Sequence, residues 1–334
     1  MEPNSSSSIT ERLLAAQWQR NSHLCIGLDL DCRKLPKGIA PTPRGLLEFG
    51  QTIVEATAEF GCCFKPNLAF WSAIGAENEL ANLFGFIQKC SGLPTILDGK
   101  YGDIGNTGEM QVMTALKRFQ ADAVTVNASL GTDILDPWLN AGLQYLVFAL
   151  CHTSNPKAAV FQEAIVREED GTEMAMFRKM ARDIMQCQTD KSARLGLVMG
   201  ATFPKQIGEL VDLIPPSTWL LIPAIGKQGA MSWRPSDRPS NSTSWSTSAV
   251  PSTTLPTELI SLKWRRRKPA SIGIKSTKPW PLKPAFLCSV LLVHSFSFPA
   301  RMPILRGFFY FYILCVTKKY VETQDFVSLR IWYM

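Results

Sequence analysis

Short apolar runs alternate with longer segments of helical periodicity along the first 230 residues of the chain. The apolar runs predict buried strands at residues 24–28, 62–64, 94–98, 123–126, 145–150, 196–200 and 219–222. The intervening segments predict helices at residues 8–20, 45–60, 70–89, 109–119, 161–185 and 205–213. Near-continuous apolar strands that alternate with helices are typical of a parallel sheet covered on both faces.

Polar residues follow nearly every predicted strand. They are Asp29, Lys65, Asp98, Lys100, Asn127, Ser154 and Gln228. In a (β/α)₈ barrel the carboxyl ends of the strands converge on one mouth, whereas in an open doubly wound sheet they spread along an edge. No G-x-G-x-x-G segment follows the first strand, which disfavours a dinucleotide-binding sheet. We therefore predict an α/β fold of the (β/α)₈ TIM-barrel class.

The strand at residues 94–98 leads into three charged residues, Asp98, Lys100 and Asp103. Strand residues two apart point to the same face, so Asp98 and Lys100 are expected to lie side by side. Buried charges must be paired, which makes such a group a costly way to build a core. An isolated D-x-K pair is commonly a weak surface ion pair. The polar residues at the other strand ends favour a catalytic site instead.

The alternation stops after residue 229. Residues 232–261 include fourteen Ser and Thr, and ten of the 22 prolines but only two of the 22 glycines lie beyond residue 230. Residues 1–230 carry 20 basic and 24 acidic residues, whereas residues 231–334 carry 15 basic and 4 acidic residues. We therefore divide the chain into a TIM-barrel domain at residues 1–230, incomplete because it lacks a recognisable eighth strand, and an irregular basic tail at residues 231–334.

The tail has two interpretations. It is either non-native sequence, from a frameshift, a retained intron or a gene-model error near codon 230, or a genuine basic interaction tail. Its apolar stretches at residues 285–300 and 302–316 are shorter than the ~20 residues of a membrane-spanning helix. We expect neither a membrane nor a nucleic acid as a partner. Nine cysteines without zinc-like spacing, and a start without a secretory signal, predict a cytoplasmic protein.

The segment at residues 97–107, LDGKYGDIGNT, resembles the D-x-K-x-x-D-I-x-x-T signature of orotidine 5′-phosphate decarboxylases. Five further segments resemble the longer subgroup of that family, at residues 27–29, 64–70, 124–127, 153–156 and 223–229. Related sugar-phosphate lyases share the D-x-K-x-x-D pattern, so the resemblance to the decarboxylases depends on all six segments together. Together the segments cover roughly residues 10–230.

The resemblance implies a TIM-barrel homodimer without cofactor or metal that converts orotidine 5′-monophosphate to UMP and CO₂, a step of pyrimidine biosynthesis. It implies an alternating charged network of Lys65, Asp98, Lys100 and Asp103. Within this network Lys100 would stabilise the carbanion formed at C6 of the pyrimidine and then protonate it.

The resemblance also implies residues that bind the substrate. Asp103, together with Ile104 and Thr107, would cross into the active site of the partner subunit. Within the same subunit, the resemblance implies that Asp29 would bind the ribose, Ser154 the pyrimidine and Gln228 the phosphate.

Two features depart from the family pattern. Tyr101 stands where the family usually has Arg, and the Gly-Arg phosphate clamp of the eighth strand has no match after residue 230. Arg234 and Arg238 lie nearby in a different context, so we expect weak or no activity from this chain. Two alternatives to the decarboxylase stay open: a related Mg²⁺-dependent sugar-phosphate lyase, and an inactive truncated barrel with an anion-binding tail.

Overall fold

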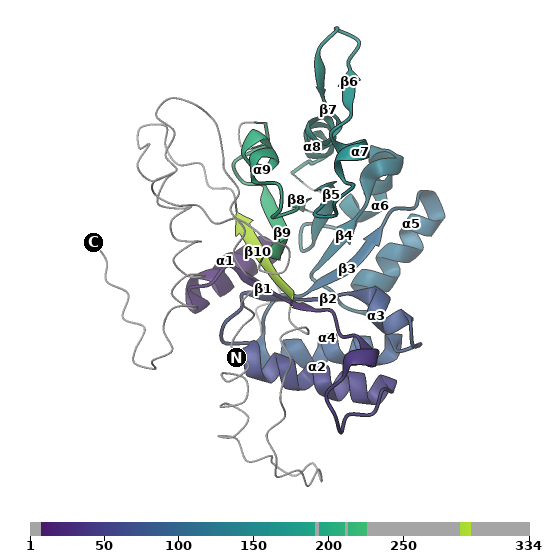
Figure 1. Cartoon of the computed structure of the whole chain (residues 1–334), viewed down its shortest axis with the longest axis vertical. Coiled ribbons are helices and arrows are strands. Elements are labelled where there is room, and N and C mark those ends of the chain that lie inside the picture. The colour runs from purple at the N-terminus through teal and green to yellow at the C-terminus, as the bar shows by residue number, and fades with distance from the viewer. Residues whose placement is uncertain (1–7, 191–193, 211–212, 226–287, 295–334) are drawn as a thin grey trace, which may run out of the picture.

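The computed structural model describes residues 8–190, 194–210, 213–225 and 288–294 (Figure 1). Eight strands form one sheet in the order β2-β1-β10-β9-β8-β5-β4-β3. Parallel bridges between Phe64 and Thr95 and between Asn67 and Asp98 join the two ends of this order, which closes the barrel. The strands are β1 (Leu24–Leu28), β2 (Cys63–Pro66), β3 (Ile96–Tyr101), β4 (Ala123–Val126), β5 (Leu146–His152), β8 (Arg194–Met199), β9 (Trp219–Ile225) and β10 (Cys288–His294).

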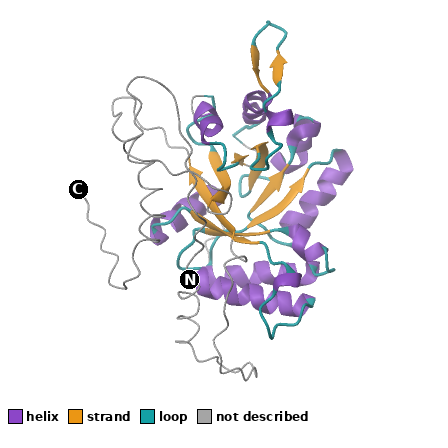
Figure 2. Ribbon diagram, viewed as in Figure 1, coloured by secondary structure: helices purple, strands orange, loops and turns teal. Residues whose placement is uncertain are grey.

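Helices surround the strands, as Figure 2 shows by colour. They are α1 (Ile9–Arg20), α2 (Pro43–Thr57), α3 (Leu68–Ser72), α4 (Glu77–Ser91), α5 (Gly105–Val112), α6 (Asp136–Leu139), α7 (Ala159–Gln162), α8 (Met176–Gln186) and α9 (Pro204–Leu210). In Figure 1, α2 and α4 lie side by side below β1 and β2. Parallel strands inside and helices outside confirm the predicted TIM-barrel class.

Local signals explain where several helices begin and end. Ser8 and Glu11 form a capping box, in which each side chain accepts a hydrogen bond from the other residue's backbone N–H. The helix predicted at residues 70–89 is two helices, α3 and α4, because the chain turns at Gly75 with a φ of 65°. The segment after α5 continues as a π-helical turn (Met113–Arg118).

The long helix predicted at residues 161–185 is wrong. The structure has α7, then an antiparallel hairpin of β6 (Ile165–Arg167) and β7 (Glu173–Ala175), and then α8. The hairpin projects from the barrel in Figure 1. Glu169, Asp170 and Gly171 form its loop: the Gly171 backbone N–H donates to the Glu168 carbonyl, and Gly171 has a φ of 85°, outside the range of an α-helix.

A strand from the tail occupies the eighth position of the barrel. Strand β10 pairs with β1 and β9 and runs antiparallel to both, whereas the other paired strands of the barrel are parallel. Cys288 lies opposite Gly27, and His294 lies opposite Trp219. The sequence showed no recognisable eighth strand in this irregular tail, and these seven residues form a strand at that position. The rest of the tail, including Arg234 and Arg238, lies outside the described residues.

Helix α1 contacts the amino-terminal end of the barrel near β3 and β4. Arg12 of α1 forms an ion pair with Asp122, which precedes β4. The other oxygen of Asp122 accepts hydrogen bonds from the backbone N–H and the hydroxyl of Thr95, at 2.8 and 3.1 Å.

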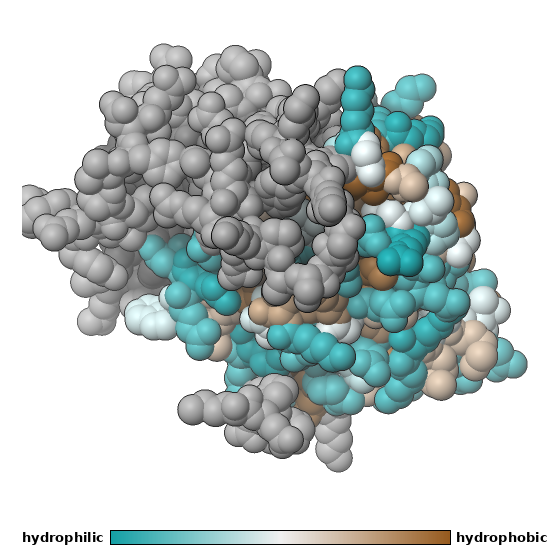
Figure 3. Space-filling model, turned by 90° about the horizontal axis from the view of Figure 1, so that it is seen from below, coloured by the Kyte–Doolittle hydropathy of each residue, from teal (hydrophilic) through white to brown (hydrophobic). Residues whose placement is uncertain are grey.

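The described surface seen in Figure 3 is mostly hydrophilic, with small apolar areas between polar ones. Among the described helices, none is both long and apolar enough to cross a lipid bilayer.

Candidate active site

Three charged side chains form a chain of contacts at the carboxyl ends of β2 and β3. Lys65 Nζ lies 2.6 Å from Asp98 Oδ2, and Lys100 Nζ lies 2.6 Å from Asp98 Oδ1. Lys65 and Asp98 are buried, with side chains 5% and 9% exposed, whereas the Lys100 side chain is 50% exposed. Asp29, after β1, places its Oδ1 4.0 Å from Lys65 Nζ. The structure thus brings together four of the predicted site residues.

The opposite charges in this buried group shift two pKa values in opposite directions. Burial alone would lower the pKa of Lys65, but the carboxylates of Asp98 and Asp29 outweigh it and raise the pKa above its ordinary value. Burial would likewise raise the pKa of Asp98, and the ammonium groups of Lys65 and Lys100 instead hold that pKa below its ordinary value. Both groups are therefore charged at neutral pH, and only Lys100 extends from the buried network toward solvent.

A bulge in β3 brings Asp98 and Lys100 together. Leu97 pairs with Val124 and Tyr101 pairs with Val126, so the three residues 98–100 face one residue of β4. Lys100 adopts the left-handed conformation, with a φ of 48°. The predicted proximity of the two side chains is correct, but it depends on a bulge rather than on the alternation of a regular strand.

Thr125 is the residue of β4 that faces the bulge, and the sequence analysis assigned it no role. Its hydroxyl accepts a hydrogen bond from the Lys100 backbone N–H at 3.0 Å and donates one to Asp98 Oδ1 at 2.9 Å. Thr125 is only 2% exposed. The one signal in the sequence is a hydroxyl residue within an otherwise apolar strand, AVTV at residues 123–126.

Asp103, Ile104 and Thr107 lie on the surface at the start of α5. Ile104 is 53% exposed, and its backbone N–H donates a hydrogen bond to Asp103 Oδ1 at 2.9 Å. Within the described part of this single chain, Asp103 forms no ion pair with the lysines. The structure therefore does not bring Asp103 into the network of its own subunit.

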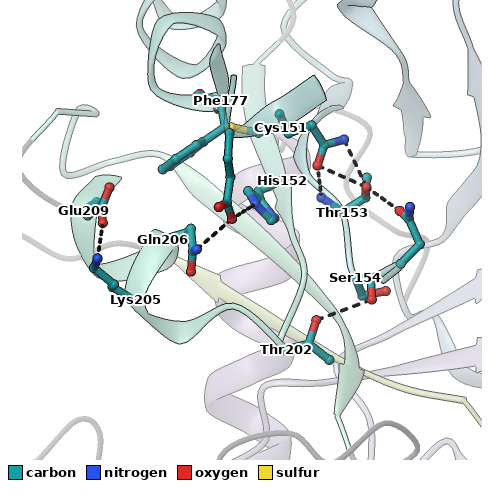
Figure 4. Close-up of polar contacts among 12 residues, drawn as sticks. Cys151, His152, Thr153, Ser154, Phe177, Thr202, Lys205, Gln206 and Glu209 are labelled. Carbon is teal, nitrogen blue, oxygen red and sulfur yellow. Dashed lines mark hydrogen bonds and ion pairs between the residues drawn. The ribbon is translucent and has the colours of Figure 1, made fainter. Parts of the chain in front are cut away.

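Ser154 follows β5 in a loop that its neighbours hold in place (Figure 4). The side chain of Gln162 accepts a hydrogen bond from the Thr153 backbone N–H at 2.8 Å and also bonds the Thr153 hydroxyl. Thr202 donates a weak hydrogen bond to the Ser154 carbonyl at 3.4 Å. A Cβ added at Gly200 would lie 2.7 Å from the Ser154 backbone, so glycine permits this close approach.

His152, at the end of β5, is fully buried behind the same loop. Its Nε2 lies 2.9 Å from Glu163 Oε1, which also accepts a hydrogen bond from Gln206 at 2.8 Å. The ring packs against Phe177 and Phe203. These contacts connect β5, α9 and the segment after α7, and Figure 4 shows the side chains converging around His152.

Gln228, the predicted phosphate ligand, lies outside the described residues. Within the described ranges, no group of three or more His, Cys, Asp or Glu side chains is placed to hold a metal ion.

Tyr101 stands at the position of the family's usual Arg. Its ring stacks on Trp138 with ring centroids 5.5 Å apart, and burial raises the pKa of Tyr101 to about 12.

Comparisons with known proteins match the barrel part of the chain. A family model described as "Orotidine 5'-phosphate decarboxylase / HUMPS family" matches residues 22–232. The chain is 41% identical to the orotidine 5'-phosphate decarboxylases of Ralstonia pickettii and Dechloromonas aromatica, over 65% of this chain and 78% of each relative. A solved structure of Leishmania donovani OMP decarboxylase is similar with a TM-score of 0.55 and 28% identity, over 66% of this chain and 80% of that one.

Proposed function

The chain belongs to the orotidine 5′-phosphate decarboxylase / HUMPS family, and from this membership we propose how its residues convert orotidine 5′-monophosphate to UMP and CO₂. The single observation that supports the residue assignment is the contact chain of Lys65, Asp98 and Lys100 at the barrel mouth. It offers one partly exposed ammonium group whose position is fixed by a buried carboxylate. The enzyme is therefore a carboxy-lyase of pyrimidine biosynthesis.

Lys100 is the proposed catalytic residue. When the bond between C6 and the carboxylate breaks, the electron pair stays on C6, where a carbanion has little resonance stabilisation. A cation beside C6 stabilises this charge more in the transition state than in the substrate. The ammonium group of Lys100 then donates a proton to C6, which gives UMP, and the neutral amine regains a proton from water.

Asp98 and Lys65 are proposed to prepare the site for this step. The Asp98 carboxylate would face the carboxylate of the substrate, and like charges ~4 Å apart repel by ~4 kcal/mol at an effective dielectric near 20. This repulsion ends when CO₂ leaves. Lys65 keeps the network close to neutral, because it is buried and bonded to Asp98.

Asp29 and Ser154 are proposed to bind the ribose and the pyrimidine, and Gln228 the phosphate. The Asp29 side chain is 27% exposed after β1, so its carboxylate can accept a hydrogen bond from a ribose hydroxyl. Ser154 lies in a loop that Gln162 and Gly200 hold in place, which suits a residue that must orient a planar ring.

A second copy of the chain is the proposed partner. Asp103, Ile104 and Thr107 lie exposed after β3, and Met110 of α5 and Leu130 after β4 are exposed apolar residues. In a homodimer, Asp103 and Thr107 would enter the neighbouring site. We further propose a cytoplasmic location, because six cysteines of the described residues are free thiols, namely Cys25, Cys32, Cys62, Cys63, Cys151 and Cys187.

The test measures UMP and CO₂ formation by the full chain and by Lys100→Ala. We expect slow turnover by the wild type, because the family's phosphate arginine has no match in the sequence, and no turnover by the variant. Lys89→Ala, which removes an exposed lysine of α4, is the matched control and should leave the rate unchanged. Turnover that survives Lys100→Ala would refute the assignment of Lys100.

A further inference from the structure

The bulge in β3 leaves part of its backbone without the usual partner strand. Between the pairs Leu97–Val124 and Tyr101–Val126, residues 98–100 face Thr125 alone. A bulge of this kind disrupts the ladder of backbone hydrogen bonds and redirects the side chains next to it. The Thr125 hydroxyl accepts the hydrogen bond of the Lys100 N–H in place of a backbone carbonyl.

The two hydrogen bonds of Thr125 fix the direction of its hydroxyl. A backbone N–H can only donate, so Oγ1 accepts from Lys100 at 3.0 Å. The hydroxyl hydrogen is then available to Asp98 Oδ1, 2.9 Å away, and a carboxylate can only accept. The same Oδ1 atom receives the Lys100 ammonium at 2.6 Å. One hydroxyl thus contacts both the backbone of Lys100 and the carboxylate that holds its side chain.

We propose that Thr125 is a positioning residue of the decarboxylase, which holds the Lys100 backbone in its left-handed conformation and orients the Asp98 carboxylate toward the Lys100 ammonium. This inference rests on the proposed function of Lys100 and extends it to a residue outside the charged network. Thr125 acts through Lys100 and Asp98.

The conformation of Lys100 makes such support necessary. A residue other than glycine at a φ of 48° is strained, and this conformation persists only where the surroundings impose it. The Lys100 side chain is half exposed and flexible, so its ammonium position depends on the backbone and on Asp98. A misplacement of about 1 Å at a reacting group is enough to slow catalysis about 100-fold.

The first test compares Thr125→Val with Thr125→Ser in the full chain. Valine keeps the shape and removes the hydroxyl, so we expect kcat to fall about 10- to 100-fold while the affinity for UMP stays within about twofold. Serine retains the hydroxyl and should recover kcat to within about threefold of wild type. Thr57→Val is the matched control, because Thr57 is equally buried and bonds only the Ile53 carbonyl within α2.

Two results for Thr125 and one for the control would overturn the proposal. One is a kcat for Thr125→Val within about twofold of wild type. The other is an equal loss in Thr125→Ser and Thr125→Val, because it would show that retaining the hydroxyl does not retain kcat. A fall in kcat for Thr57→Val as large as that for Thr125→Val would also overturn the proposal, because the hydroxyl of Thr57 bonds the Ile53 carbonyl within α2 and neither Lys100 nor Asp98.

A second measurement does not depend on turnover. Amide hydrogen exchange at Lys100 should accelerate at least about tenfold in Thr125→Val and remain as in wild type in Thr125→Ser, because the Thr125 hydroxyl accepts the hydrogen bond of that N–H. If the wild type shows no turnover, the proposed function fails, and the exchange rates still test the role of Thr125. An unchanged exchange rate in Thr125→Val would refute it.

Discussion

Replacement of Lys65 by methionine tests whether the buried ion pair is as strongly coupled as its geometry indicates. Methionine has a similar length and keeps the apolar stem but removes the ammonium group, which lies 2.6 Å from Asp98 Oδ2. Asp98 would then be a buried carboxylate whose remaining cation, Lys100, is half exposed. We expect the variant to be markedly destabilised, because the loss of one partner leaves the other charge buried and uncompensated.

The magnitude follows from the distance and the burial. At 2.6 Å and an effective dielectric near 20, two unit charges attract by about 6 kcal/mol. Part of this energy offsets the cost of removing both charges from water. Breaking a buried pair of this kind lowers the free energy of unfolding by about 3–5 kcal/mol. The double variant Lys65→Met/Asp98→Asn should lose less than the sum of the single losses, with a coupling of about 2–3 kcal/mol.

Urea unfolding, followed by fluorescence and circular dichroism together, gives these free energies. The matched control is Arg44→Met, because Arg44 and Glu48 form an ion pair at 2.9 Å on the exposed surface of α2. That pair should contribute only about 0.3–0.5 kcal/mol. If Lys65→Met costs less than about 1 kcal/mol, or no more than the control, then the network is not the buried charged unit described above.

The coupling also has a defined pH range. The pKa of Asp98 is lowered in the folded state, so its contribution is present above about pH 4 and is lost as the pH falls through the folded value. The pKa of Lys65 is raised, so its contribution is present below about pH 10 and is lost as the pH rises through the folded value. The double-mutant coupling should therefore be constant from about pH 5 to about pH 9, and a maximum inside that range would contradict it.

Two other perturbations test features outside the charged network. Burial raises the pKa of Tyr101 to about 12, so wild-type stability should fall relative to Tyr101→Phe as the pH rises from about 10 to about 12; parallel curves for the two proteins would refute this. In strand β10, Val290→Pro removes a backbone N–H from a central position between β1 and β9 and should cost about 3 kcal/mol or more of unfolding free energy. An unchanged thermal midpoint for Val290→Pro would show that the tail strand does not complete the barrel.

Much of the barrel could be predicted because its signal is local. Each predicted strand is a short apolar run, such as VTV after Ala123, and nearly every one is followed by a polar residue at the mouth. The hairpin at residues 165–175 was missed because the charged face of the following helix extended the helical pattern backwards over it. The Asp170-Gly171 turn was the overlooked signal, since glycine after aspartate favours a hairpin turn.

The position of β10 could not be predicted for a different reason. Its pairing with β1 and β9 joins segments that are far apart in the sequence, and no turn or periodicity near residues 288–294 specifies a partner. An open position between two strand edges favours an apolar segment of the right length in either direction. The direction is therefore a property of the assembled sheet and not of the segment.

The sequence by itself determined which residues reach the mouth, because strand period and strand end are local properties: Asp29, Lys65, Asp98 and Lys100 each follow or end an apolar run. Only the tertiary structure decided how they meet. The bulge that places Lys100 against Asp98 exists because β4 supplies one residue, Thr125, opposite three of β3. This mismatch depends on how β3 and β4 pair with each other. The sequence of either strand alone is compatible with regular pairing, so the bulge cannot be predicted from one strand.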